Sequence, residues 1–224
     1  YGALVWSGDI KSSFPSMKNQ VAAGLNMGIA GIPWWTTDIG GFFGANINDP
    51  EFHELLIRWF EYGCFCPVMR LHGYRWPLQP QYGTTGGATC VSGAPNEVWS
   101  YTDQVCEILS DYLRLRERML PYITELMEEA HEKGTPVMRP LFYDFPEDKE
   151  SWNVETEYMF GPKVLVKPIT DADARETDVY LPGGASWTNA WTGETFEGGQ
   201  KVHVAAPIEQ IPLFTRDGYK LPMK

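Results

Sequence analysis

Three polar side chains recur at similar intervals near the start of the chain, and each follows an apolar stretch. Asp9 ends the segment "LVWSGD", Asp38 ends "PWWTTD", and His72 follows "CFCPVMRL"; the two intervals are 29 and 34 residues. Carboxyl groups and imidazoles are common proton-transfer groups in enzymes. An aspartate after Ser-Gly is, taken alone, more typical of a turn, and a lone histidine is more often structural. The joint placement of the three residues favours a functional site.

The segment around Asp38 combines aromatic rings, a carboxylate and glycines. Trp34 and Trp35 precede the aspartate, and "GGFF" at residues 40–43 follows it. Aromatic rings can pack on the apolar faces of a sugar, carboxylates accept hydrogen bonds from hydroxyls, and glycines tolerate the positive φ of a steep turn. The segment therefore predicts one wall of a sugar pocket, with a plain turn as the simpler alternative. Since the two tryptophans alternate sides of a strand, we expect at least one in the core.

The elements that must position these residues alternate between strand and helix. The predicted helices end near Gly28 and at Gly63, and Asp49 with Pro50 marks the start of the second one. The alternation indicates parallel strands joined by crossover helices, and roughly 31 residues per unit is the repeat of a (β/α)8 barrel. A doubly wound sheet ranks second, because no glycine-rich phosphate loop is visible. The predicted strands span residues 3–9, 29–36 and 64–71.

Polar residues at the carboxyl ends of barrel strands lie on the catalytic face. Beyond the third predicted strand, residues 73–95 are expected to form a long loop, and a helical region follows at about 97–133. We expect Asn96 to cap this region and Pro121 to kink or divide it. Its arginine-rich stretch "LRLRER" favours a solvated or salt-bridged helix face over a binding patch.

The pattern changes after Gly134. Short strand-like segments separated by turn signals such as "PGG", "TGE" and "RDG" predict an all-β module, a sandwich packed against the barrel. Trp187 and Trp191 fit the core of such a sandwich better than a sugar-binding surface. The sequence thus predicts an α/β part at residues 1–134 and an all-β part at 135–224.

Composition narrows the classes of partner. A formal net charge of −11 over 224 residues argues against nucleic acid and anionic membrane surfaces, and no apolar run has the ~18 residues of a membrane span. The four cysteines lack the spacing of a zinc site, and we expect neither a metal nor a cofactor. Cys64 and Cys66 are expected to point the same way along a strand as small apolar residues. The chain begins inside an apparent strand without an initiator methionine, so we expect a piece of a longer protein, and its compartment is not indicated.

Several ordered motifs resemble glycoside hydrolase family 31, the α-glucosidases and α-xylosidases. They are "WSGD", "DIGGFF", "MRLHG", "LRLRERMLPYI", "GTPVMRPLF", "MFGPKVLVKPI", "VYLPGG", "WTGETFEGGQ" and "APIEQIPLF", and they cover essentially the whole chain. The resemblance implies strands six to eight of a (β/α)8 barrel, followed by the proximal C-terminal β-sandwich domain. It implies part of a retaining exo-acting α-glycosidase that hydrolyses terminal non-reducing α-linked glucose or xylose in an oligosaccharide or α-glycoside.

The resemblance also implies roles for individual residues. Asp9 matches the general acid/base of the family. Trp6 matches an aromatic residue that lines the sugar subsite, and Asp38 and Phe42 match residues at the edge of that pocket. His72 matches a histidine that binds sugar hydroxyls, and Arg70 matches an arginine that supports this histidine. The family's nucleophile, an aspartate on the fourth strand, and a sugar-contacting arginine would lie upstream of Tyr1. The upstream part of the same enzyme is therefore the expected partner.

Retaining glycosidases explain these residue types. They use two carboxyl groups about 5–5.5 Å apart, one a nucleophile and one a proton donor that starts out neutral. We expect burial beside Trp6 to keep Asp9 protonated. Two alternatives stay open: a non-catalytic fragment or carbohydrate-binding remnant, and, within the family, a transglycosidase or α-glucan lyase. The stretches "MRLHGYR" and "NEVW" lean toward the α-xylosidase branch.

Overall fold

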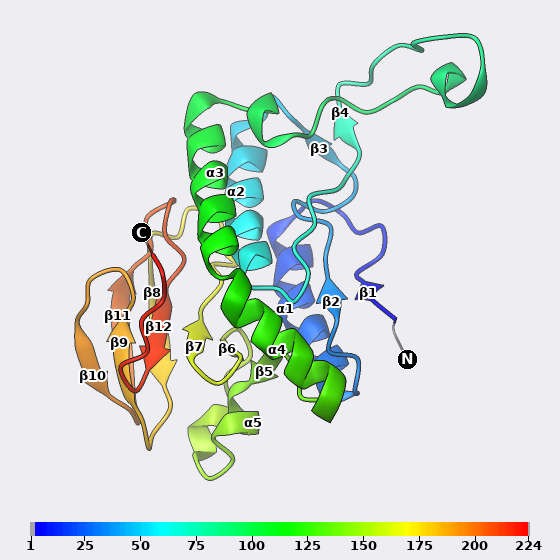
Figure 1. The fold of residues 1–224 in the computed structure, drawn as a ribbon. Helices are drawn as coiled ribbons and strands as arrows, with labels where there is room; N and C mark the ends of the chain where they lie inside the picture. Colours follow the sequence, from blue (N-terminus) through cyan, green and yellow to red (C-terminus); the bar gives the residue numbers. More distant parts are fainter. Residues whose placement is uncertain (1–2, 224) are drawn as a thin grey trace.

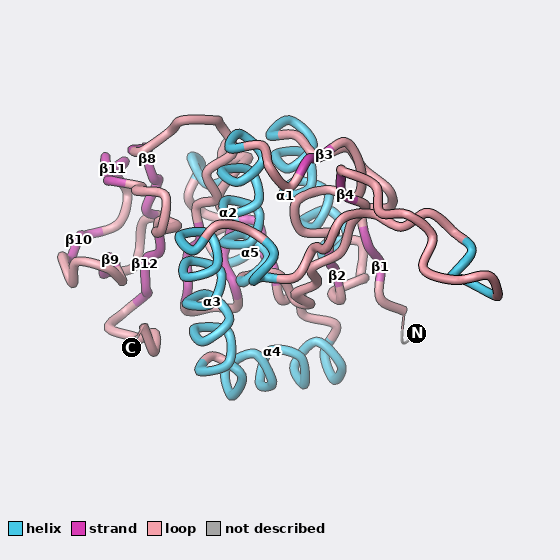
Figure 2. Tube along the Cα trace, turned by 90° about the horizontal axis from the view of Figure 1, so that it is seen from above, coloured by secondary structure: helices cyan, strands magenta, loops and turns pink. Residues whose placement is uncertain are grey.

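The computed structural model describes residues 3–223, which form a mainly helical part and a β-rich part (Figure 1). Seen from above, the strands within residues 176–216 lie on one side of the helices, and the first two strands of the chain lie on the other (Figure 2). The helical part contains β1 (Val5–Trp6), α1 (Phe14–Ile29), β2 (Trp35–Thr36), β3 (Ala45–Asn46), α2 (Pro50–Cys64), β4 (Arg75–Trp76), the 3-10 turns η1 (Gly86–Thr89) and η2 (Val98–Ser100), α3 (Asp103–Arg118) and α4 (Leu120–Lys133).

Parallel pairing, the main prediction for the helical part, is confirmed. Strand β1 pairs with β2 in parallel, with Val5 opposite Trp35, and β3 pairs with β4 in the same sense. A further parallel bridge joins Ile39 to Leu71. Helices α1 and α2 separate these segments along the chain, which is the connection that parallel strands require. This part is a section of a barrel wall.

The prediction of a strand at residues 64–71 is wrong. Helix α2 continues to Cys64, and the following segment makes only two backbone bonds to the β2 region, from the Val68 amide to the Trp35 carbonyl (3.1 Å) and from the Ile39 amide to the Arg70 carbonyl (3.2 Å). Within the described chain this segment has a strand neighbour on one side only, so its pairing is reduced to single bonds. Cys64 and Cys66 are fully buried, as expected, but on a helix end and the turn after it.

Local signals place the ends of α1 and α2. The Asp49 side chain accepts a hydrogen bond from the Glu51 amide (3.0 Å) and Pro50 begins α2, which confirms the predicted start. The Ser13 side chain caps α1 in the same way. Glycine in α1 allows close packing: a Cβ at Gly24 would lie 2.7 Å from the indole of Trp35. Trp35 is 3% exposed, so one of the two adjacent tryptophans is core, as predicted.

The long helical region is divided where Pro121 predicts. Helix α3 ends at Arg118 and α4 begins at Leu120, with the proline in its first turn. The expected cap is wrong: Thr102, not Asn96, caps α3. The Asn96 side chain instead accepts hydrogen bonds from the side chains of Arg75 and Tyr101, which draw it away from the helix start.

The arginine-rich stretch is also only partly solvated. The Arg116 guanidinium is inserted beneath α2 and donates to the carbonyls of Cys64 (2.7 Å), Cys66 (2.7 Å) and Pro67 (2.8 Å). These include orphan carbonyls at the C-terminus of a helix, which a cation satisfies and stabilises. Arg114 matches the prediction, since it is exposed and pairs with Asp111.

The second part is a β-sandwich, as predicted. A six-stranded antiparallel sheet of order β10-β9-β12-β7-β6-β5 faces the β11-β8 pair. Side chains of both sheets share one apolar core, in which Trp187 is fully buried. Trp191 is half-buried and donates its indole N–H to the Ile211 carbonyl (2.7 Å). The elements are β5 (Met138–Pro140), α5 (Leu141–Asp144), η3 (Lys149–Trp152), β6 (Tyr158–Phe160), β7 (Val164–Val166), β8 (Glu176–Leu181), β9 (Ser186–Asn189), β10 (Thr195–Glu197), β11 (Gln200–Ala205) and β12 (Leu213–Arg216).

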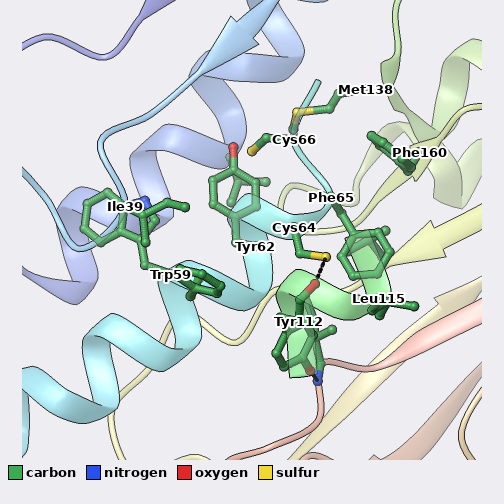
Figure 3. Close-up of a cluster of buried hydrophobic side chains, with 14 of the residues drawn as sticks. Ile39, Trp59, Tyr62, Cys64, Phe65, Cys66, Tyr112, Leu115, Met138 and Phe160 are labelled. Atoms are coloured by element: carbon green, nitrogen blue, oxygen red, sulfur yellow. Dashed lines mark hydrogen bonds between the residues drawn. The ribbon is translucent and has the colours of Figure 1, made fainter. Parts of the chain in front are cut away.

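A continuous apolar core joins the two parts (Figure 3). The rings of Phe65 and Phe160 meet edge to face at 5.9 Å, and the Tyr158 hydroxyl donates to the Phe65 carbonyl (3.0 Å). Met138 of β5 belongs to the same core. The sandwich therefore buries the turn after α2, from which the chain runs on to His72.

Among residues 3–223, no helix combines the length and the apolar composition needed to cross a bilayer. Within the same residues, no group of three or more histidine, cysteine, aspartate or glutamate side chains is arranged to hold a metal ion.

Candidate active site

The three polar residues singled out by spacing follow parallel segments that end at one rim. Asp9 lies three residues after β1, Asp38 lies two residues after β2, and His72 follows the bridge residue Leu71. The segment after Asp9 is tied to the loop after Asp38 by a bond from the Phe42 amide to the Ile10 carbonyl (2.7 Å). The geometry thus brings together the loops that carry all three residues.

Asp38 is a fully buried carboxylate in this rim. The Arg70 Nη1 lies 2.9 Å from Asp38 Oδ1, an ion pair that is off the ideal hydrogen-bonding direction, and neither carboxylate oxygen has an aligned donor within the described chain. Burial raises the pKa of Asp38 above its ordinary value. The positive charge of Arg70 and the proximity of His72 oppose the rise, while the nearby Asp9 carboxylate adds to it.

Backbone turns at two glycines explain how the loop after Asp38 bends back. Gly40 and Gly41 have φ values of 85° and 75°, which favour glycine. The second glycine also meets the neighbouring segment closely, because a Cβ there would lie 2.7 Å from the Ser12 amide nitrogen. The predicted need for glycine at this rim is confirmed.

Phe42 and His72 form one aromatic edge of the rim. Their ring centroids are 5.6 Å apart with the planes inclined by 40°. Phe42 is half-buried, His72 is exposed, and the Arg70 side chain is 38% exposed. A half-buried ring beside an exposed imidazole and a guanidinium offers an apolar face together with hydrogen-bonding groups, which is the combination a sugar ring requires.

Asp9 and Trp6 lie at the open side of the rim. The expected burial of Asp9 beside Trp6 is not found: the aspartate is exposed and the tryptophan is 48% exposed. Within the described chain β1 pairs with β2 alone, so its other edge leaves both side chains without a cover. The side chains of Trp6 and Asp9 are therefore accessible to any further segment that pairs with this edge of β1.

Sequence reasoning missed Arg75, whose side chain makes five hydrogen bonds at the rim. It is fully buried, and its guanidinium donates to main-chain carbonyls of both rim loops. An arginine three residues after the histidine of "LHGYR" gives no sequence signal of burial, because arginine is rarely buried unless it is paired.

Comparison with known families supports a specific relationship. The family model described as the glycosyl hydrolases family 31 TIM-barrel domain matches residues 1–126, and that of the family 31 C-terminal domain matches residues 134–221. An α-xylosidase of Saccharolobus solfataricus is 38% identical over all of this chain, which spans 28% of that protein. The α-glucosidase 2 of Bacillus thermoamyloliquefaciens is 35% identical over 96% of this chain and 25% of its own length.

Solved structures agree in fold. A family 31 α-xylosidase from a soil metagenome, complexed with xylose, superposes with a TM-score of 0.94 at 53% identity, covering 99% of this chain and 33% of that one. A xylosidase from Aspergillus niger superposes with a TM-score of 0.87 at 37% identity, covering 96% of this chain and 32% of that one. The chain thus spans about a third or less of the relatives it matches. It belongs to glycoside hydrolase family 31 and comprises part of the TIM-barrel domain followed by the C-terminal domain.

Proposed function

We propose that this chain is a segment of a retaining, exo-acting α-glycosidase and that it supplies the general acid/base of the reaction. The observation that carries the proposal is the convergence of Asp9, Asp38 and His72 at the ends of parallel segments in a family 31 barrel. The nucleophilic carboxylate comes from the part of the barrel domain that precedes these strands.

Asp9 acts first as acid and then as base. It protonates the glycosidic oxygen as the bond to the anomeric carbon breaks, while the nucleophile forms a glycosyl-enzyme intermediate. It then takes a proton from the water that hydrolyses this intermediate, which restores the neutral acid. The exposure of Asp9 at the free edge of β1 is compatible with this role, since the sugar and the opposite barrel wall would enclose it.

The other rim residues bind the sugar. His72 and Arg70 donate to hydroxyls, and Trp6 and Phe42 present ring faces that exclude water. Asp38 belongs to this set as the buried carboxylate that orients Arg70 through their 2.9 Å ion pair. A sugar that lacks the matching hydroxyl would leave these polar groups unpaired and would be rejected.

Xylose is the proposed terminal sugar. The 53% identical structure from a soil metagenome was solved with xylose, and the relative from Saccharolobus solfataricus, which matches this whole chain, is an α-xylosidase. Glucose is the second candidate, because the α-glucosidase 2 of Bacillus thermoamyloliquefaciens is 35% identical over 96% of this chain, and a stretch of 77 residues is 74% identical to a Pseudescherichia vulneris protein named as an uncharacterized family 31 glucosidase. The hydroxymethyl group of glucose is the chemical difference that the pocket must accept or exclude.

The test uses the full-length protein and pairs of substrates. We expect a higher kcat/KM on an aryl α-xyloside than on the matched aryl α-glucoside; the reverse ranking would assign glucose. Asp9→Asn should abolish turnover of natural α-glycosides and should impair substrates with activated leaving groups much less, because these need little proton assistance. Equal losses on both kinds of substrate would show that Asp9 is not the acid.

A further inference from the structure

We propose that Arg75 is a positioning residue that fixes the two sugar-binding loops of the rim against each other. The inference rests on the proposed function, since it concerns the same site. Arg75 has no exposed surface and cannot contact a substrate itself. Its effect must pass through the loops that it holds, which carry Asp38, Phe42 and His72.

The Arg75 side chain makes five hydrogen bonds, and all three of its nitrogens take part. Nη1 donates to the carbonyls of Gly41 (2.8 Å) and Phe42 (3.4 Å), and Nη2 donates to those of Ile39 (3.2 Å) and His72 (3.4 Å). Nε donates to the Asn96 side chain (3.2 Å). Four of the acceptors are main-chain carbonyls in the loop after β2 and in the loop that carries His72. Main-chain bonds also join these loops, from the Ile39 amide to the Arg70 carbonyl and from the Tyr74 amide to the Phe42 carbonyl. The guanidinium contacts both loops between these two bonds, so one planar group fixes their spacing there.

The arginine is itself held in place from three directions. Its backbone pairs with Ala45 of β3, and its guanidinium lies 4.9 Å from the centroid of the Phe52 ring on α2. Asn96 completes the support from the long loop. Since a fixed guanidinium has a rigid fork of donors, the acceptors must adapt to it. The rim loops thus take their geometry from a residue that is anchored outside the rim.

Two glycines leave the space that the guanidinium occupies. A Cβ at Gly40 would lie 2.9 Å from Arg75 Nη2, and a Cβ at Gly73 would collide with the guanidinium. Both glycines have positive φ, 85° and 151°. The glycines of "DIGG" and "LHG" therefore serve the arginine as well as the turns, and the three residues form one unit.

The chain offers a matched control in Arg116. This arginine also donates to three main-chain carbonyls, those of Cys64, Cys66 and Pro67, but it does so at the C-terminal end of α2, before the segment that leads to the rim. Loss of either guanidinium should lower stability. Only loss of the Arg75 guanidinium should alter sugar binding and turnover.

The test compares Arg75→Lys with Arg116→Lys in the full-length protein. Lysine keeps the charge but cannot reach several acceptors with a planar fork. We expect Arg75→Lys to lower kcat/KM on the preferred aryl α-glycoside by about 10²-fold, the scale of a small misplacement of binding groups. Arg116→Lys should leave kcat/KM unchanged. Equal effects of the two variants, or full activity of Arg75→Lys, would overturn the proposal.

A double-mutant cycle separates positioning from general stability. If Arg75 acts through His72, Arg75→Lys should cost much less in a His72→Ala background than in the wild type. Additive losses would contradict the inference. If Arg75→Lys does not fold, Asn96→Ala serves instead, because it removes one support of the guanidinium. This variant should lower kcat/KM by a smaller factor, and Asn96→Asp should restore it. An unchanged kcat/KM of Asn96→Ala would contradict the inference.

Hydrogen exchange distinguishes failure of this inference from failure of the proposed function. A wild-type protein with no activity on either aryl α-glycoside would refute the function alone. The amides of residues 39–43 should still lose protection in Arg75→Lys and keep it in Arg116→Lys. Unchanged protection of these amides in Arg75→Lys would refute the positioning role whether or not the protein is active.

Discussion

Replacement of Arg58 by methionine should sharply weaken the attachment of the sandwich to the barrel segment. Arg58 lies on α2 and is fully buried. Its guanidinium contacts Glu61 Oε2 (3.1 Å) and donates to four main-chain carbonyls of the sandwich, those of Ala174 (2.9 Å), Ala206 (2.6 Å), Pro207 (3.0 Å) and Gln210 (3.4 Å). Methionine fills much of the same space but donates no hydrogen bond.

The magnitude follows from what the variant leaves unpaired. Removal of one partner of a buried ion pair costs about 3–5 kcal/mol when the other partner stays charged, which is an upper bound here because burial raises the pKa of Glu61 and favours its neutral form. Glu61 keeps one partner, the Tyr112 hydroxyl at 3.1 Å, and it can take up a proton, which limits the cost. The four carbonyls lose bonds worth about 1 kcal/mol each, but these terms are not additive and water can reach part of the loops. We therefore expect a loss of about 4 kcal/mol, a large share of a typical stability of about 5–15 kcal/mol.

The assay is urea unfolding followed by tryptophan fluorescence, with Arg114→Met as the control. Arg114 and Asp111 form an arginine–carboxylate pair with the same spacing of three residues on a helix, but their side chains are 65% and 68% exposed. Loss of such a surface pair costs about 0–1 kcal/mol. The double variant Arg58→Met/Glu61→Leu should recover part of the loss, because it removes the unpaired carboxyl group.

Two results would refute this reasoning. If Arg58→Met and Arg114→Met lowered the free energy of unfolding by the same small amount, burial would not be the deciding factor. If the double variant were less stable than Arg58→Met alone, Glu61 would be stabilising without its arginine, and the cost of the unpaired carboxyl group would have been misjudged.

Three further predictions concern pH, packing and activity. Burial raises the pKa of Glu61 from 4.5 to about 8, so the folded protein binds this proton more tightly than the unfolded chain does. The free energy of unfolding should therefore fall as the pH rises from about 4.5 to 8. Glu61→Gln should flatten this part of the pH profile. Gly24→Ala should lower the free energy of unfolding by about 1–3 kcal/mol in a urea titration, because the new Cβ would lie 2.7 Å from the Trp35 indole. This clash should outweigh the gain of roughly 1 kcal/mol in helix propensity. A stabilised variant would show that the indole can move aside. The 224-residue chain alone should not hydrolyse aryl α-glucoside or aryl α-xyloside, because no residue in it matches the family's nucleophile. The full-length protein should hydrolyse one or both of these substrates. Turnover by the 224-residue chain that Asp9→Ala abolishes would show that the nucleophile or the fold has been misassigned.

Local chemistry in the sequence determined several helix ends, the parallel order of the first segments and the family. Asp49 and Pro50 start α2, and Pro121 separates α3 from α4, because a capping side chain and a missing N–H act within one helical turn. The spacing of Asp9, Asp38 and His72 predicted parallel segments with a shared rim, since each unit of strand and helix has a nearly fixed length. The motifs around these residues indicated family 31.

Only the tertiary structure decided the contacts between distant segments. Arg75 binds carbonyls up to 36 residues away, and Arg58 reaches carbonyls as far as 152 residues away. The same is true of Arg116, which lies beneath the end of α2, and of Asn96, which supports Arg75 instead of capping a helix. Buried arginines leave no local pattern, because their acceptors are main-chain carbonyls that every residue carries. Which carbonyls lack a partner is fixed only when strands, turns and helix ends have been brought together in space.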